Sequence, residues 1–174
     1  FAKSSGDLRY VDSDGDVALV AGGVVPQATR AIFFGVPERS GWWGRVGPEV
    51  DDVLARSRLA DHPVLQNCDL DTVPFVGARD IDLPADSLVL VETAQRVPLV
   101  YRVRKGPRTA MVINMDAWAS DFYYSAWFPI LVYNGARHLM SREASLASAY
   151  ALGQTVTLPF ATKENQVTSI RVND

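Results

Sequence analysis

The chain has few residues of the kinds that build chemical sites. Its 174 residues include one cysteine, Cys68, and two histidines, His62 and His138. A single cysteine excludes an internal disulfide and a zinc site made of several cysteines. Two isolated histidines give no support for the ligand spacing of a zinc motif. The sequence also has no GxGxxG, no phosphate-binding loop and no GxSxG, so we expect no cofactor.

Strong charge and long apolar runs are missing as well. The net charge is −3 and the isoelectric point is about 5.4. Such a balance lacks the clustered basic face that nucleic acids usually require, so we expect no nucleic-acid partner. The longest uncharged run, residues 122–136, has about 15 residues, short of the roughly 20 that cross a bilayer. We therefore expect no membrane-spanning segment in this chain.

What is present is a globular pattern. Hydrophobic residues make up 48% and charged residues 21%, which predicts a packed core. Short apolar runs bounded by glycine, proline and polar residues are typical of strands. We expect strands at residues 17–21, 30–35, 72–81, 87–92, 98–104 and 109–115, with a hairpin between the last two. A helix is expected at 128–140, and a loose excursion with a helical turn near 50–59.

These elements predict an α/β domain with a mainly parallel sheet flanked by helices, because the runs at 17–21 and 30–35 suit strands buried on both faces. We assign residues 1–141 to this domain. Residues 142–174 are expected to be a connector and the start of a β-rich segment, since 154–160 and 166–172 alternate with period two. The chain begins at Phe1 and ends directly after an expected strand, so we expect a piece of a longer protein.

The candidate ligand or partner surface lies where a strand leads into the helix. In α/β domains ligands bind beyond the carboxyl ends of the strands. Polar and aromatic residues gather there, and a second aromatic pair lies in the excursion; both sets also suit core packing or a helix start. The predicted surface residues are Trp118, Ser120, Asp121, Phe122, Tyr124, Trp42 and Trp43.

Two further motifs are weaker candidates for a chemical site. Asp12, Asp14 and Asp16 match the first positions of a calcium loop, but Val17 and Gly23 stand where glycine and glutamate are required. A solvated acidic turn explains them better, so we predict no metal. Cys68 would need His62 or His138 as a base, and it has no strand–turn–helix elbow around it. A small, partly buried thiol is the better explanation.

Several short motifs together resemble the extracytoplasmic region of bacterial aerotolerance-type (Bat-like) membrane proteins. The residues that carry the likeness are 30–35 (RAIFFG), 61–65 (DHPVL) with Asp69-Leu70, 88–92 (LVLVE), 98–100 (PLV), 111–115, Ser120-Asp121, 128–131 (FPIL) and 134–139 (NGARHL). These proteins contain a von Willebrand factor A-like domain and a glutamine-amidotransferase-like domain. The likeness covers about two thirds of the chain and implies a class I glutamine-amidotransferase-like or flavodoxin-like fold.

The resemblance implies an interaction or scaffolding module without enzymatic activity, since family members generally lack the catalytic cysteine and histidine. It implies an extracytoplasmic location in the cell envelope, with a membrane anchor in parts of the protein outside this sequence. Protein partners would include other domains of the same protein and a MoxR-type ATPase; a homodimer stays open. The alternative function is a hydrolase or amidotransferase-like enzyme with a displaced site. Its nucleophile would be Cys68 with His62, or Ser120 with Asp121 and a histidine.

Overall fold

The computed structural model describes residues 15–21, 28–36, 40–51, 54–116, 119 and 121–141. All of them except Ser141 belong to one compact unit, Phe1–Met140. The β-rich segment expected within 142–174 lies outside the described residues, and the proposed division at 141 stays a prediction. No helix in the described ranges is long and apolar enough to cross a bilayer, in agreement with the sequence.

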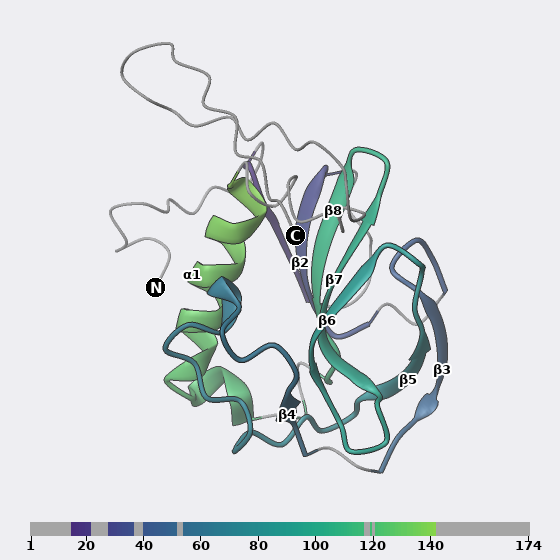
Figure 1. Ribbon diagram of the computed structural model, residues 1–174, viewed down its shortest axis with the longest axis vertical. Coiled ribbons are helices and arrows are strands. Elements are labelled where there is room, and N and C mark those ends of the chain that lie inside the picture. The colour runs from purple at the N-terminus through teal and green to yellow at the C-terminus, as the bar shows by residue number, and fades with distance from the viewer. Residues whose placement is uncertain are drawn as a thin grey trace, which may run out of the picture. The chain divides into compact units, whose positions relative to one another are not determined.

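A six-stranded mixed sheet organises the unit (Figure 1). Its strands run in the order β1-β2-β8-β7-β6-β4; β1, β2 and β8 are parallel neighbours, and the pairs from β8 to β4 are antiparallel. The bounds are β1 Ala18–Ala21, β2 Arg30–Phe34, β4 Arg56–Ser57, β6 Ser87–Glu92, β7 Pro98–Lys105 and β8 Arg108–Ile113. A separate antiparallel pair comprises β3 Arg45–Glu49 and β5 Arg79–Asp82. The helical elements are η2 Pro63–Leu65, η3 Asp121–Tyr124 and α1 Trp127–Met140.

The predicted α/β class, a parallel sheet flanked by helices, is wrong. Strands account for 39% and helix for 19% of the structure, and α1 is the one α-helix among the described residues. The error has a physical cause. An apolar run indicates that a strand is covered on both faces, but it does not say by what. Here α1 covers one face, and β3 and β5 lie on the other (Figure 1), so β7 is buried on both faces although its two neighbours are antiparallel.

Several local predictions are confirmed. The hairpin pairs β7 with β8 in continuous register from Val100–Ile113 to Lys105–Arg108. The helix expected at 128–140 is α1, with Pro129 in its first turn, where a missing N–H costs nothing. Two predictions are wrong: the 72–81 strand is reduced to β5, and the helical turn near 50–59 is replaced by the short strand β4.

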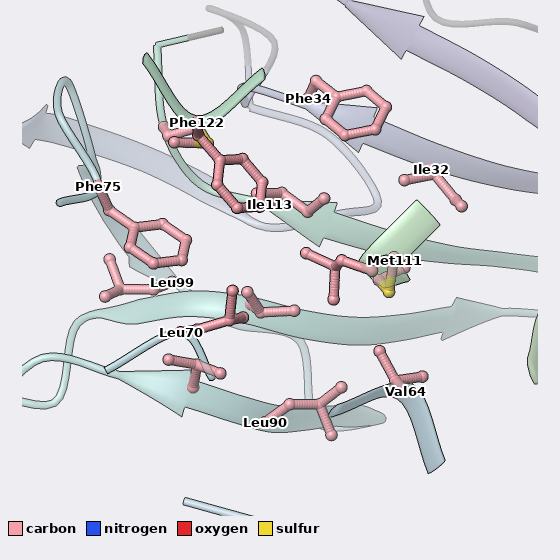
Figure 2. Close-up of a cluster of buried hydrophobic side chains, with 14 of the residues drawn as sticks. Ile32, Phe34, Val64, Leu70, Phe75, Leu90, Leu99, Met111, Ile113 and Phe122 are labelled. Atoms are coloured by element: carbon pink, nitrogen blue, oxygen red, sulfur yellow. The ribbon is translucent and has the colours of Figure 1, made fainter. Parts of the chain in front are cut away.

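The core has two parts, one on each face of the sheet. The larger part lies under α1, where residues from β2, β6, β7, β8 and the 64–75 segment meet (Figure 2). Phe75 stacks on Phe122 there at 6.3 Å between ring centroids. The smaller part lies on the opposite face, where Phe33, Trp43 and Tyr101 pack with Ile81 of β5. Packing on both faces stabilises the sheet, and the side chains that face solvent lie at the ends of its strands.

Candidate functional site

The loop that follows β8 is the predicted ligand or partner surface, and its backbone is held firmly. Asp116 N–H donates to the Val76 carbonyl at 2.7 Å, and its Oδ1 accepts from Ala119 N–H at 3.2 Å. Phe122 is buried at 4% exposure, whereas Tyr124 is 90% exposed. Trp118 and Ser120 lie outside the described residues.

A shallow pocket of about 230 Å³ opens beside this loop. Its lining is mostly apolar and contains one carboxylate, that of Asp121. The lining residues are Thr72, Val73, Pro74, Asp121, Phe122, Ser125 and Trp127. Of the predicted surface residues, the structure brings Asp121 and Phe122 together here. The aromatic floor offers a stacking surface, and the Asp121 carboxylate and the Thr72 and Ser125 hydroxyls offer hydrogen-bonding groups. The Ser125 hydroxyl donates to the Phe122 carbonyl at 2.7 Å.

The aromatic pair in the excursion lies on the opposite face of the sheet. Trp43 is buried, and its ring lies 5.8 Å from that of Phe33; Trp42 is half-buried and contacts both rings. The Trp43 carbonyl accepts a hydrogen bond from Tyr101 Oη at 3.0 Å. These contacts give both tryptophans a packing role. The partner surface inferred from the aromatic residues stays a prediction.

Cys68 is poorly placed to act as a nucleophile. It is half-buried, and its Sγ lies 3.8 Å from the Trp127 carbonyl, to which the thiol donates. Burial, with the Asp69 carboxylate beside it, raises the pKa of the thiol to about 11. Because the thiolate is the reactive form, this side chain is inert at neutral pH. The arrangement agrees with the interpretation of Cys68 as a packed thiol.

The weak calcium motif is only partly described. Asp12 and Asp14 lie outside the described residues, and Asp16 is exposed at the start of β1. Within the part of the chain that the structure describes, no three His, Cys, Asp or Glu side chains gather closely enough to hold a metal ion.

The two histidines, far apart in sequence, meet in space. His62 precedes η2, and its Nδ1 accepts from Val64 N–H at 3.2 Å. His138 lies in the last turn of α1, and its ring centroid is 4.8 Å from that of His62. Arg102 of β7 reaches the same place, with Nη1 3.5 Å from His138 Nε2. We call these three residues the His–Arg cluster.

The environment of the His–Arg cluster favours neutral imidazoles. Burial, then the neighbouring His62 and Arg102, lowers the pKa of His138 to about 4. Burial and the Arg102 charge also lower the pKa of His62. An imidazole that stays neutral near pH 6 can accept a hydrogen bond from the guanidinium, as His138 does. A structural role at the end of a helix is the simplest account of this contact.

The cluster predicts a loss of stability in mild acid. Because the folded pKa of His138 lies below the unfolded value of about 6.5, the unfolded chain binds more protons between about pH 6.5 and pH 4. The free energy of unfolding should fall by about 1–2 kcal/mol between pH 7.5 and pH 5, after discounting for solvent screening at this half-buried site. Urea unfolding in phosphate-free buffer measures it. His138→Gln should lose most of this pH dependence; an unchanged dependence in the variant would contradict the assignment.

The end of the sheet next to the cluster is strongly basic. Thr109 of β8 lies between two arginines, since it pairs with Arg104 of β7 on one side and with Arg30 of β2 on the other. At the hairpin turn, Lys105 of β7 pairs with Arg108 of β8. Opposite residues share a face, and Arg102 points from the same face of β7 as Arg104. The hairpin turn and the C-terminal end of α1 lie at the same end of the sheet (Figure 1). We call the group Arg30, Arg102, Arg104, Lys105 and Arg108 the basic end.

Acidic residues also lie near the basic end. Asp16 and Asp86 stand just before β1 and β6 at this end of the sheet. Two ion pairs, Arg45–Asp82 and Arg58–Glu92, lie elsewhere in the unit. The charge pattern was visible in the sequence, since four of the five cations fall in the predicted hairpin. The net charge of −3, which is summed over the whole chain, does not report this local cluster of cations.

No family model matches the chain, but it is similar to known proteins both in sequence and in fold. It is 31% identical over 119 residues to a tRNA U34 carboxymethyltransferase of Chromohalobacter salexigens, an alignment covering 62% of this chain and 36% of that protein. The chain thus spans about a third of the length of this curated relative. Its fold is similar to that of a cytoplasmic protein from Salmonella typhimurium, with a TM-score of 0.51, 14% identity and 71% of each chain covered.

These findings correct the predicted function. The expected scaffold was a non-enzymatic module anchored in the cell envelope, yet a protein similar in sequence is named as a tRNA U34 carboxymethyltransferase, and a protein of similar fold is named as a cytoplasmic protein. The predictions of no enzymatic activity and of an extracytoplasmic location are therefore wrong, as is the alternative of a displaced hydrolase or amidotransferase site. Nothing in the comparisons points to Bat-like proteins, and that resemblance stays a prediction.

Proposed function

We propose that this chain is the RNA-holding part of a tRNA-modifying enzyme, and that its basic end contacts the phosphate backbone. The observation that carries the proposal is the basic end itself, in which five cations gather at one end of the sheet. The likeness to a tRNA U34 carboxymethyltransferase supports RNA as the polyanion. A MoxR-type ATPase partner stays a prediction of the Bat-like resemblance and has no part in this proposal.

The proposal departs from the expectation of no nucleic-acid partner. That expectation used the net charge, which sums acids and bases over the whole chain. Phosphate contacts depend on the local field instead, because exposed charges more than about 8 Å apart are largely screened at physiological salt. Arg104, Lys105 and Arg108 are exposed together on one hairpin, so their fields add at the place where a backbone would lie.

The transfer chemistry is not assigned to the described residues. A carboxymethyl transfer needs a donor group, and the described pocket does not fit one well. It is shallow and mostly apolar, its single carboxylate, Asp121, repels an acidic donor, and Cys68 beyond it is a neutral thiol. Because the chain spans about a third of the similar enzyme, substrate holding is the part of the work that we propose for it.

The test compares two variants with the same net charge. The hairpin variant is Arg104→Gln/Lys105→Gln/Arg108→Gln. The control variant is Arg45→Gln/Arg58→Gln/Arg96→Gln, in which Arg45 and Arg58 are ion-paired and Arg96 lies in the turn at the other end of β7. Each loses three positive charges, so each goes from −3 to −6.

We expect the hairpin variant to bind unmodified tRNA about 100-fold more weakly at low salt, at roughly 1 kcal/mol for each lost contact. The slope of log affinity against log salt should become shallower by about 2–3, since each phosphate contact contributes about 0.7–0.9. The control variant should lose much less affinity. Fluorescence anisotropy with labelled tRNA measures both. If the two variants lost equal affinity for tRNA, the loss would be explained by the change in net charge alone, and the proposal would be overturned.

A further inference from the structure

The shallow pocket beside the loop after β8 is built from two segments that the core holds together. Asp121 and Phe122 come from η3, and Trp127 is the first residue of α1. The other lining segment, 72–74, precedes Phe75, whose ring stacks on that of Phe122 at 6.3 Å between centroids (Figure 2). Because Phe75 and Phe122 are both buried, the two lining segments are held in place before any ligand binds.

The size and the lining of this pocket favour a single flat ring system. Its volume of about 230 Å³ lies below the roughly 300–1,000 Å³ of pockets that take drug-sized ligands. The lining is mostly apolar, and Trp127 is only half-buried, which leaves an aromatic surface for stacking. Nucleobases use such surfaces, since every base has a π-face. A nucleobase therefore suits the pocket, with its sugar and phosphate left outside.

The polar groups of the lining select among the bases. A carboxylate such as that of Asp121 has two acceptor oxygens and no donor. The Ser125 hydroxyl donates to the Phe122 carbonyl, so towards a ligand its oxygen is an acceptor as well. A base must therefore present N–H groups to the pocket. Guanine has two adjacent donors on one edge, N1–H and the 2-amino group, and this edge matches the two oxygens of one carboxylate. On the same edge of adenine, cytosine and uracil, the donor group stands next to an acceptor.

We propose that this pocket binds a guanine base, whose N1–H and 2-amino group donate to the Asp121 carboxylate while its ring stacks on Trp127. The inference rests on the proposed function for the source of the base, which would be the RNA held at the basic end, although a free guanine nucleoside has the same chemistry. β8 joins the two places, because it begins at Arg108 of the basic end and its last residue, Ile113, leads into the loop beside the pocket. Its 6 residues span about 20 Å, so one RNA strand of several nucleotides can reach both.

The test follows the indole N–H signals of the tryptophans by NMR in the full chain, which contains 4 of them. Trp127→Phe removes one signal and so assigns that of Trp127. Guanosine is titrated in at neutral pH, and inosine, which lacks only the 2-amino group, is the matched ligand. We expect guanosine to shift the Trp127 signal and to bind about tenfold more tightly than inosine, because inosine makes one of the two hydrogen bonds. A Trp127 signal that ignores guanosine, or equal affinity for the two nucleosides, would overturn the inference.

Two variants with the same change of charge make the test specific. Asp121→Asn keeps the shape of the side chain but turns one acceptor oxygen into an amino donor. We expect it to bind guanosine about tenfold more weakly and to lose the preference for guanosine over inosine. Asp80→Asn is the control, because Asp80 is exposed on β5, in the two-stranded sheet, and this variant should bind guanosine as the unmodified chain does. An Asp121→Asn variant that still prefers guanosine would show that the carboxylate does not read the base.

The same samples separate this inference from the proposed function. If tRNA binds through the hairpin while the Trp127 signal responds neither to tRNA nor to guanosine, the proposed function stands and the guanine site is wrong. If guanosine shifts the Trp127 signal while tRNA does not bind at low salt, the site stands, its ligand is a free guanine nucleoside or nucleotide, and the proposed function is wrong. A response to both ligands, weakened together in Asp121→Asn, supports the inference in full.

Discussion

Replacing Asn114 by aspartate should lower the free energy of unfolding by about 3–5 kcal/mol, the largest effect expected in this molecule. Asn114 follows β8 and is 1% exposed. Its Nδ2 donates to the carbonyls of Arg79 and Pro98, both at 2.7 Å, and its Oδ1 accepts from Arg79 N–H at 3.0 Å. One amide thus joins β5, the start of β7 and the end of β8.

Aspartate is nearly the same shape as asparagine but has no N–H groups to donate. In Asn114→Asp a carboxylate oxygen would face two carbonyl oxygens at hydrogen-bond distance, in a place that water does not reach. Asn134→Asp is the matched control, because Asn134 also donates to two carbonyls, those of Gln66 at 2.8 Å and Val64 at 3.3 Å, but is half-buried. There we expect a cost of about 1 kcal/mol. Urea unfolding at pH 7 compares the two, and equal costs would show that Asn114 does not join the strands as described.

Replacing Gly77 by alanine should cost about 3 kcal/mol, the second large effect. Gly77 has φ +72°, and a Cβ added to it would lie 2.6 Å from Asp116 Cβ and 3.1 Å from Asp116 N. The neighbouring residue, Val76, accepts the hydrogen bond from Asp116 N–H. A methyl group here would push apart the two segments that hold the loop after β8.

Gly106 isolates the backbone contribution. It has φ +57°, and a Cβ added there would have nothing within 4 Å. Gly106→Ala should therefore cost about 1 kcal/mol from backbone strain alone. The difference of about 2 kcal/mol between the two variants measures the clash with Asp116. Thermal and urea unfolding would give this difference, and equal costs would mean that the loop moves aside freely.

The sequence predicted local elements better than their arrangement. The hairpin of β7 and β8 and the helix α1 were predicted because the Lys105-Gly106-Pro107-Arg108 turn and Pro129 fix their boundaries locally. The sheet order was not predictable in the same way. β2 lies beside β8, with about 70 residues of chain between them, and no local pattern reports that pairing. The short strand β4 was read as part of a helical turn because two residues carry no period.

The candidate site shows the same limit. His62 and His138 were treated as two isolated histidines, since nothing in the sequence shows that η2 and the end of α1 pack together around Arg102. The basic end could have been found. Arg102, Arg104, Lys105 and Arg108 fall within a hairpin that the sequence predicts, and a hairpin places such side chains at one end of a sheet. Counting charge over the whole chain, and not over the hairpin, concealed the pattern.

The salt dependence of tRNA binding by the unmodified chain is the decisive test of whether the basic end holds RNA. If the four cations of the basic end that solvent reaches, Arg30, Arg104, Lys105 and Arg108, each contact a phosphate, log affinity should fall with log salt with a slope of about −2.8 to −3.6. Anisotropy titrations between low and physiological salt give this slope. We expect binding with that slope. No binding at low salt, or a slope near zero, would contradict the assignment of this chain to RNA.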